Sequence, residues 1–444
     1  MRRRKSMNTV CIRRYGPALL FGVALLLSIV SPGWAEIPGV NGPILNCTAK
    51  ADYITLGDGL TLQIWGFAPG NGRAQYPGPT VFVNQGETVI VNLTNDLAEP
   101  VSMIFPGQAN VVATEVTPPT AAGLVTLEAL PGGTVSYTFE VTEPGTYCYQ
   151  SGTNMDKQIP MGLFGALIVR PSVAPFNDGK HAYNHEDSAF DREFLFLLSE
   201  MDIVHQEMVE FGEPIDTTTF FPVYWFINGR NAPDTMYPAG VPWLPTQPYN
   251  CMPMIMPGEK MLMRVIGIGR DLHPFHYHGN HARIIAKDGR LLSSVPGAGA
   301  DLSHDLFTIQ STPGNTFDAI FQWTGRGLGW DIYGTGPGYE HDCMDMDGDG
   351  YDDMTYEYCA DHGKSFPVIL PAQLELTFGG MWSGSPFLGD SGSLPPGQGG
   401  LNPMAAFTFM WHSHTEKEMV NNDIFPGGMM TMMMVMPHGS MAME

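Results

Sequence analysis

Basic residues are scarce in this chain. Its 444 residues include 22 Lys and Arg against 45 Asp and Glu, which gives a formal net charge of −23 at pH 7. Such an acidic surface disfavours nucleic acid and anionic membranes as partners. It suits metal cations as partners, or simply solubility.

Long apolar runs are also scarce. The run near the N-terminus, ALLFGVALLLSIV, is shorter than the about 20 residues of a membrane span. Basic residues precede it and Gly33-Trp34-Ala35 follows it, as in an export signal. We predict a signal peptide over residues 1–35, a periplasmic or extracellular mature protein and no integral membrane span. The ordinary secretory route is the default, although two Arg-Arg pairs also allow the twin-arginine route.

Cysteine is limited to six residues, one of which lies in the predicted signal. In an exported protein the remaining cysteines are expected to form disulfides rather than catalytic thiols. Cys343 and Cys359 bracket one short loop and are the predicted pair. For Cys47, Cys148 and Cys251 the sequence does not choose a pairing.

Short alternating strands separated by Gly and Pro dominate the rest of the chain. Examples are TVFVNQGETVIVNLTN in the first half and AAFTFMWHSH near the C-terminus. This pattern predicts an all-β fold of antiparallel barrels or sandwiches. Breaker-rich segments divide the chain into a first domain, a linker, a second domain and an insertion within the second domain, predicted over residues 36–173, 174–191, 192–440 and 336–400, respectively.

Four segments carry a resemblance to a known family. They are PGPTVFVNQGETVIVNLTN continuing into VSMIFPG, then EPGTYCYQSGTNMDKQIPMGLFGALIV, LHPFHYHGNH and FMWHSHTEKEMVNNDIFPGGMMTMMMV. With these segments the chain resembles a two-domain multicopper oxidase of the cupredoxin type. The resemblance implies two cupredoxin-like Greek-key β-barrels, a blue copper and a three-copper cluster held by ten His and one Cys, and a homotrimer.

The first two segments lack the expected ligands. Where the family has a His-x-His pair, the first segment has Ile104 and Pro106, and the second has Gln150 and Gly152. These side chains offer no imidazole to a metal. The first domain is therefore expected to keep the fold without a copper site.

The last two segments keep five His. By resemblance His273 matches a blue-copper ligand, and the remaining matches to the three-copper cluster are His276, His278, His412 and His414. Residues two apart on a strand point to one face, and neutral imidazole suits copper or zinc. We predict one copper or zinc ion in the second domain. The alternative is that water, Glu416, Glu418 or Asp423 satisfies these imidazoles.

The blue-copper position has lost its thiolate. Ser413 stands where the family has Cys, and Glu418 stands where it has the second His, with Met429 or Met430 as candidate axial ligands. A serine hydroxyl is a hard ligand, whereas blue copper depends on a polarizable thiolate. We therefore expect neither a blue copper centre nor a full three-copper cluster.

The insertion contains a run of oxygen donors at alternate positions, close to the calcium-loop pattern. The predicted calcium ligands are Asp345, Asp347, Asp349, the carbonyl of Tyr351, and Asp353. Tyr356 occupies the twelfth position, where an EF-hand has Glu. The alternative is a solvated acidic loop closed by the predicted disulfide.

Two functions follow from these predictions. The first is an exported multicopper-oxidase-like copper-binding protein, an oxidoreductase that uses one residual metal in the second domain. The second is a non-catalytic extracellular structural or interaction protein with a calcium-ordered loop. The missing ligands argue against a third function, that of an active multicopper oxidase.

Overall fold

The computed structural model describes residues 37–326, 331, 340–363, 385–387 and 406–436. The predicted signal and most of the predicted insertion lie outside these residues. In the described part of the chain, no helix has the length and apolar character needed to cross a membrane.

The first half of the chain forms two main sheets around one apolar core. The five-stranded sheet has the order β3-β2-β5-β9-β6, the four-stranded sheet has the order β1-β4-β11-β10, and β7 pairs with β8. The core contains Val91 and Tyr137 from the first sheet and Leu167 and Tyr149 from the second. The elements are β1 Val40–Asn41, β2 Ile44–Thr55, β3 Thr61–Pro69, β4 Val81–Asn84, β5 Thr88–Asn95, β6 Val112–Thr117, β7 Thr120–Ala122, β8 Leu127–Ala129, β9 Thr134–Glu140, β10 Gly145–Gln150, α1 Met155–Met161 and β11 Phe164–Arg170.

The second half repeats this arrangement. One sheet has the order β13-β12-β15-β21-β17-β18 with β19 beside β17, and the other has the order β14-β24-β23-β16-β20 with β22 beside β23. Phe196 and Phe321 meet Phe275 and Trp411 in the core between them. The elements are η1 Glu186–Ser188, β12 Arg192–Met201, α2 Ile203–Glu210, β13 Tyr224–Ile227, η2 Asp234–Met236, β14 Met254–Ile255, β15 Lys260–Gly267, β16 His273–Tyr277, β17 Ala282–Lys287, β18 Arg290–Leu291, β19 His304–Leu306, β20 Thr308–Ser311, β21 Thr316–Gln322, η3 Cys359–Asp361, β22 Ser385–Phe387, β23 Ala406–Ser413, η4 Glu416–Met419 and β24 Met430–Val435.

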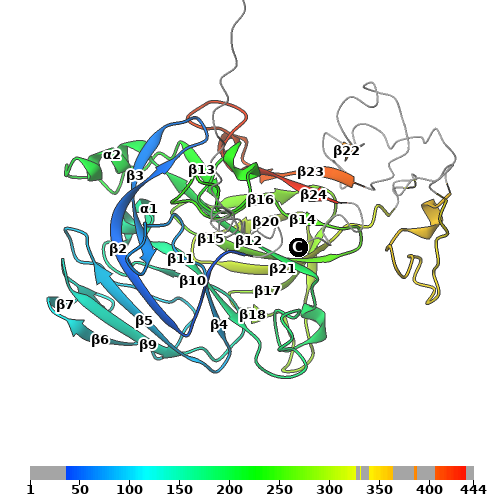
Figure 1. Ribbon diagram of the computed structural model, residues 1–444, viewed down its shortest axis with the longest axis horizontal. Helices are drawn as coiled ribbons and strands as arrows, with labels where there is room; N and C mark the ends of the chain where they lie inside the picture. The colour runs from blue at the N-terminus through cyan, green and yellow to red at the C-terminus, as the bar shows by residue number, and fades with distance from the viewer. Residues whose placement is uncertain (1–36, 327–330, 332–339, 364–384, 388–405, 437–444) are drawn as a thin grey trace, which may run out of the picture.

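The parallel pairings show that the two halves share a topology. In the first half β2 pairs with β5 and β4 with β11, and in the second half β12 pairs with β15 and β14 with β24, all in parallel. The all-β, cupredoxin-like fold predicted from the sequence is confirmed. Figure 1 shows the blue and cyan strands of the first half beside the green to red strands of the second.

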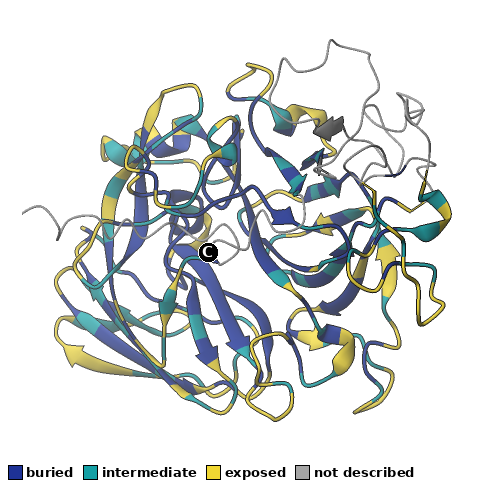
Figure 2. Cartoon of the chain, turned by 45° about the vertical axis from the view of Figure 1, so that its right-hand side comes forward, coloured by how far each residue is buried: buried dark blue, intermediate teal, exposed yellow. Residues whose placement is uncertain are grey.

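An apolar layer joins the two halves. Successive residues of β11 face opposite sides, so that Leu167 enters the first core while Ile168 faces the second half. On β12, Phe196 enters the second core while Leu197 faces the first half. Strands buried on both faces explain the continuous apolar runs FGALIV and FLFLL. Figure 2 shows these central strands in dark blue.

Candidate metal centre

Two neighbouring strands bring three imidazoles together. β16 and β23 are antiparallel, with His276 directly opposite His412, and His278 follows β16 on the same face as His276. One ring nitrogen from each of His276, His278 and His412 lies within 4.8 Å of the others. We call these three residues the imidazole cluster. His278 and His412 are buried, and His276 is partly buried.

Hydrogen bonds orient the rings of the cluster. His276 Nδ1 lies 2.8 Å from the hydroxyl of Thr308, and His412 Nδ1 lies 2.7 Å from the carbonyl oxygen of Ser413. Because a carbonyl only accepts, His412 must donate from Nδ1, and its Nε2 carries a lone pair when the ring is neutral. That Nε2 lies 3.3 Å from His278 Nε2.

Burial keeps these rings neutral. Burial, and next the positive charge that neighbouring imidazoles would carry, lower the pKa of His276 to about 4 and that of His278 to about 3. Burial also lowers the pKa of His412. At neutral pH the three rings are therefore uncharged and able to bind a metal.

His414 lies at the rim of the cluster. Its ring centroid is 4.8 Å from that of His276, and 55% of its side chain is exposed. Its Nδ1 is 3.9 Å from a carboxylate oxygen of Glu416. It is therefore placed to serve as an outer ligand rather than a buried one.

His273 lies apart from the imidazole cluster. Its ring is fully buried, with Nε2 at 2.9 Å from Glu200 and Nδ1 at 2.9 Å from Glu418. Because carboxylates accept, both nitrogens must donate, and the ring is an imidazolium with no lone pair for a metal. Burial acts to lower the pKa of His273, but the hydrogen bonds that the ring donates to Glu200 and Glu418 outweigh it and raise the pKa to about 9.

The backbone around Glu200 is shaped to hold this ion-pair cluster of His273, Glu200 and Glu418. The amide N–H of Arg270 donates to Glu200 at 2.5 Å. Gly269 has a φ of +106°, and a Cβ there would overlap the Glu200 carboxylate. A glycine is required at this position because no other residue leaves that space. Sequence reasoning found Glu418 but missed Glu200, which lies 73 residues before His273.

The corresponding place in the first half holds no imidazole. Ile104 and Gln150 form an antiparallel bridge, as His276 and His412 do in the second half. A Cβ on Gly152 would come within 2.7 Å of the Ile104 side chain. Nearby, the hydroxyls of Ser102 and Thr153 are hydrogen-bonded at 2.8 Å. An aliphatic side chain and a hydroxyl pair therefore fill this space.

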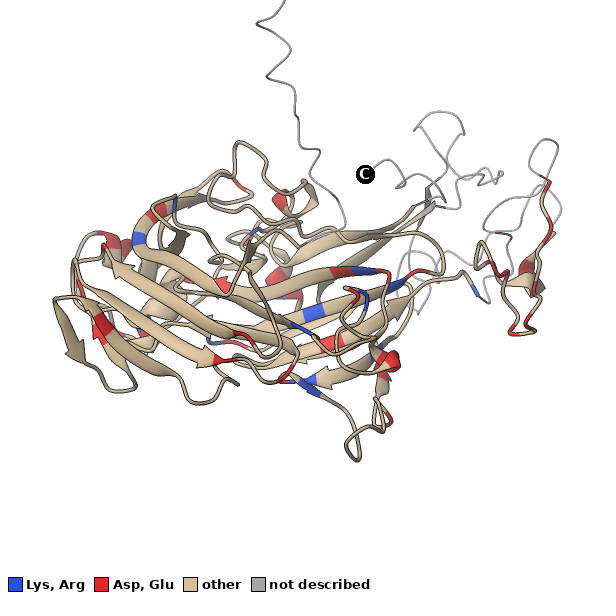
Figure 3. Cartoon of the chain, turned by 60° about the horizontal axis from the view of Figure 1, so that its bottom comes forward, with Lys and Arg blue, Asp and Glu red and all other residues tan. Residues whose placement is uncertain are grey.

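A second group of possible metal ligands, all carboxylates, lies on the loop of residues 340–363. Figure 1 shows this loop projecting from the second half. The carboxylates of Asp345, Asp347 and Asp349 lie within 4.8 Å of one another and are exposed. Asp345 accepts from the amides of Gly348 at 2.7 Å and Gly350 at 3.0 Å. Figure 3 shows the acidic residues gathered on this loop.

The loop is closed by a disulfide between Cys343 and Cys359, whose Cα atoms are 5.5 Å apart. Cys47, Cys148 and Cys251 are free and buried. Sequence reasoning missed a third group of possible ligands, namely Asp331, His341, Glu357 and His362. Its signal was the His-x-Cys and Cys-x-x-His spacing at the two ends of the closed loop.

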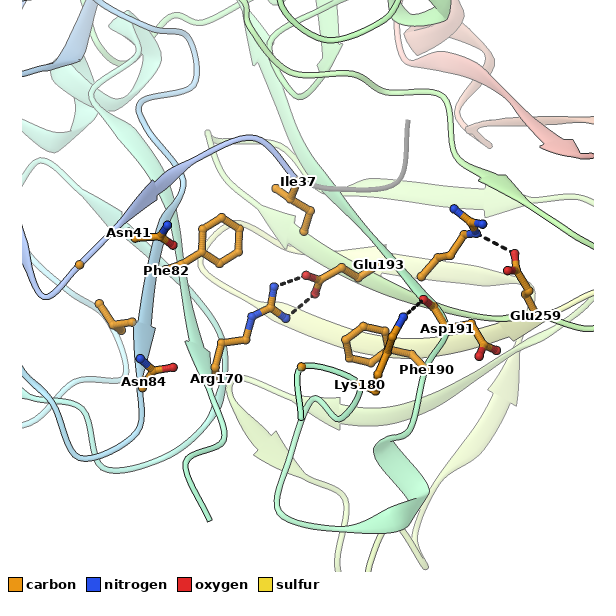
Figure 4. Close-up of a pocket in the computed structure, with 14 residues that line it drawn as sticks. Ile37, Asn41, Phe82, Asn84, Arg170, Lys180, Phe190, Asp191, Glu193 and Glu259 are labelled. Atoms are coloured by element: carbon orange, nitrogen blue, oxygen red, sulfur yellow. Dashed lines mark hydrogen bonds and ion pairs between the residues drawn. The ribbon is translucent and has the colours of Figure 1, made fainter. Parts of the chain in front are cut away.

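A pocket of about 690 Å³ lies between the halves, as Figure 4 shows. Four of its charged side chains form two ion pairs, Arg170 with Glu193 and Arg192 with Glu259. None of its described lining residues is His or Cys. The three groups of possible metal ligands in the described chain lie outside this pocket.

The fold and the imidazole cluster define a protein of two cupredoxin-like barrels. The family model "Multicopper oxidase" matches residues 50–173. Two solved structures share the fold. The multicopper oxidase mgLAC has a TM-score of 0.54 and 17% identity, and the blue copper oxidase from Nitrosomonas europaea has a TM-score of 0.53 and 19% identity. Each match covers 88% of this chain and 85% of the other.

Parts of the sequence also match known oxidases. The iron transport multicopper oxidase fetC of Epichloe festucae is 29% identical over 49% of this chain and 31% of its own length. The L-ascorbate oxidase of Brassica rapa subsp. pekinensis is 34% identical over 31% of this chain and 22% of its own. The chain therefore matches less than a third of these relatives' length. A multicopper oxidase family model and a multicopper oxidase relative thus match parts of this chain, and its fold is that of solved multicopper oxidases.

Proposed function

We propose that the protein is an exported, copper-binding, oxidoreductase-like member of the multicopper oxidase superfamily that uses a single metal ion in the second half. It works without a blue copper and without a complete three-copper cluster. A copper ion at the imidazole cluster supplies one-electron or Lewis-acid chemistry.

The separation of two ring nitrogens carries this proposal. Metal–nitrogen bonds of roughly 2.0–2.1 Å in tetrahedral geometry separate two ligands by roughly 3.3 Å. The Nε2 atoms of His278 and His412 are 3.3 Å apart. His276 supplies a third ligand from the same face, and His414 lies near enough to supply a fourth.

The restriction to one ion rests on four residues. Ile104 and Gln150 occupy the place in the first half that His276 and His412 occupy in the second. His273 is held as an imidazolium by two carboxylates. Ser413 is fully buried and offers a hydroxyl in place of a thiolate. None of these groups suits a blue or a clustered copper.

Two further properties belong to this proposal. The basic and then apolar segment over residues 1–35 supports export to the periplasm or the cell exterior. The convergence of Asp345, Asp347 and Asp349 supports calcium binding at the tip of the loop, with Asp353 and the Tyr351 carbonyl as further donors. Calcium there would order the loop rather than take part in copper chemistry.

Copper content and electron paramagnetic resonance test the proposed function. The wild-type protein loaded with Cu²⁺ should show nitrogen-coupled signals and no intense thiolate-to-copper absorption band. The double variant His276→Gln, His278→Gln should bind about one copper fewer per chain, because it removes two of three ligands. The matched control, His304→Gln, changes an exposed imidazole on β19 and should bind copper as the wild type does. Unchanged copper content and spectrum in the double variant would refute the proposal.

A further inference from the structure

A group of four side chains at the base of the projecting loop is separate from the imidazole cluster and from the acidic tip of the loop. One ligand atom from each of Asp331, His341, Glu357 and His362 lies within 4.8 Å of the others. We call these residues the loop-base cluster. We propose that it is a second metal site, which takes a divalent ion of the zinc class.

In the loop-base cluster the two carboxylates are buried and the two imidazoles are partly exposed. The side chains of Asp331 and Glu357 are 0% and 2% exposed, whereas those of His341 and His362 are 28% and 21% exposed. An ion can therefore reach the site past the two rings and be held from below by the two carboxylates. Imidazole nitrogen combined with carboxylate oxygen suits zinc and related transition metals, whereas calcium takes oxygen ligands only.

The contacts already point the groups toward one another. The Glu357 carboxylate lies between the two rings. His341 Nε2 is 3.1 Å from one of its oxygens, and His362 Nδ1 is 2.9 Å from the other. His362 Nδ1 is 3.7 Å from Asp331. The centroids of the two rings are 4.7 Å apart. A single ion with bonds of roughly 2 Å spans ligands up to roughly 4 Å apart, so small side-chain movements would close the site.

The charge balance favours a dication. Two neutral imidazoles and two carboxylates carry a net charge of two negative units. Both carboxylates are buried. Burying two carboxylates together is unfavourable, because each loses hydration and repels the other. A divalent ion removes this repulsion.

The position of the site in the chain suggests what the ion does. Asp331 follows β21, whereas the other three ligands belong to the loop of residues 340–363. His341 and His362 stand just outside the two cysteines of the disulfide. The loop also touches the barrel where the Tyr356 ring fills the space beside Gly258. An ion at the loop-base cluster fastens the neck of the loop to the second half.

Metal analysis of the full chain in the His276→Gln, His278→Gln background tests this inference independently of the proposed function. This protein should bind one Zn²⁺ per chain, and Co²⁺ should give a d–d spectrum without a thiolate charge-transfer band. Adding Glu357→Gln or His362→Gln should weaken Zn²⁺ binding by about a hundredfold. His304→Gln, which changes an exposed imidazole on β19 outside the proposed metal sites, is the matched control and should leave Zn²⁺ binding unchanged.

Several results would overturn the inference. One is that the background protein binds neither Zn²⁺ nor Co²⁺. Another is that the proteins with Glu357→Gln and with His362→Gln both bind Zn²⁺ as tightly as the background protein does. Circular dichroism and thiol labelling of Cys343 and Cys359 verify that each variant keeps its barrels and its disulfide. If a loop variant misfolds, the Co²⁺ stoichiometry of the background protein alone decides the matter.

Discussion

At the scale of single residues, His273 shows how two carboxylates change what an imidazole can do. A metal ligand needs a lone pair, and the imidazolium between Glu200 and Glu418 has none. The resemblance to multicopper oxidases predicted a blue-copper role for His273. The structure instead gives it two acceptors, of which only Glu418 lies in one of the four segments that carry the resemblance.

His273→Gln should destabilise the protein by about 3–5 kcal/mol at pH 7, because it leaves two buried carboxylates without their shared cation. The stabilisation from His273 should also depend on pH. The pKa of His273 is raised to about 9, so the folded state holds a proton that the unfolded state releases above about 6.5. The contribution is complete below about pH 6.5 and is lost as the pH rises through about 9.

Urea unfolding of both proteins between pH 6 and pH 10 measures this effect. The difference between wild type and His273→Gln should shrink toward alkaline pH, whereas the exposed control His304→Gln should track the wild type throughout. A difference that stays constant across this range would contradict the charged state of His273.

At the scale of elements, strand alternation explains which parts of the sites were predictable. The two-residue spacing of His276 and His278 placed them on one strand face, whereas the calcium-loop pattern placed Asp345, Asp347 and Asp349 together. Contacts that cross between distant elements were not predictable. Thr308 on β20 reaches His276 only through the pairing of β16 with β20.

The loop-base cluster was missed for the same reason. Asp331 and His341 are separated by ten positions, and the cluster forms only because the loop of residues 340–363 returns His362 and Glu357 to them. No periodicity in the sequence records that return. The disulfide was predictable because both cysteines close one short segment.

The loop tip should bind calcium through its three carboxylates. Titration of the wild type with Ca²⁺ should protect residues 343–359 from limited proteolysis, because the ion links groups that otherwise repel one another. Asp347→Asn should weaken this protection on the order of tenfold in calcium concentration. Asp342→Asn, an exposed change on the same loop but outside the group, should leave the protection as in the wild type. Equal calcium dependence of the two variants would exclude the site.

At the scale of the whole molecule, alternating strands and breaker spacing were enough to predict two β-rich halves. The way the halves join could not be read from the pattern, because a strand buried on both faces resembles any apolar run. The junction also contains charge. Arg264 on β15 is fully buried, lies 2.9 Å from Glu193, and donates to the Thr146 hydroxyl of the first half at 2.8 Å.

Arg264→Met should lower the free energy of unfolding by about 3–5 kcal/mol, because it leaves Glu193 and Asp318 buried with less positive charge beside them. Arg283→Met removes the exposed pair with Asp305 and should cost about 0–1 kcal/mol. Chemical denaturation of the two variants measures both values. Similar losses in the two variants would show that the buried network does not join the halves.

The apolar layer between β11 and β12 explains why the first half is kept although Ile104 and Gln150 replace imidazoles there. In the described part of the chain, each half presents an apolar sheet face that the other half covers. Deleting the first half would expose that face on the second and invite aggregation. The first half, with Ile104 at the place that His276 takes in the second, still covers the apolar face of the second half. Its interior can therefore change, whereas the surface that contacts the second half stays constrained.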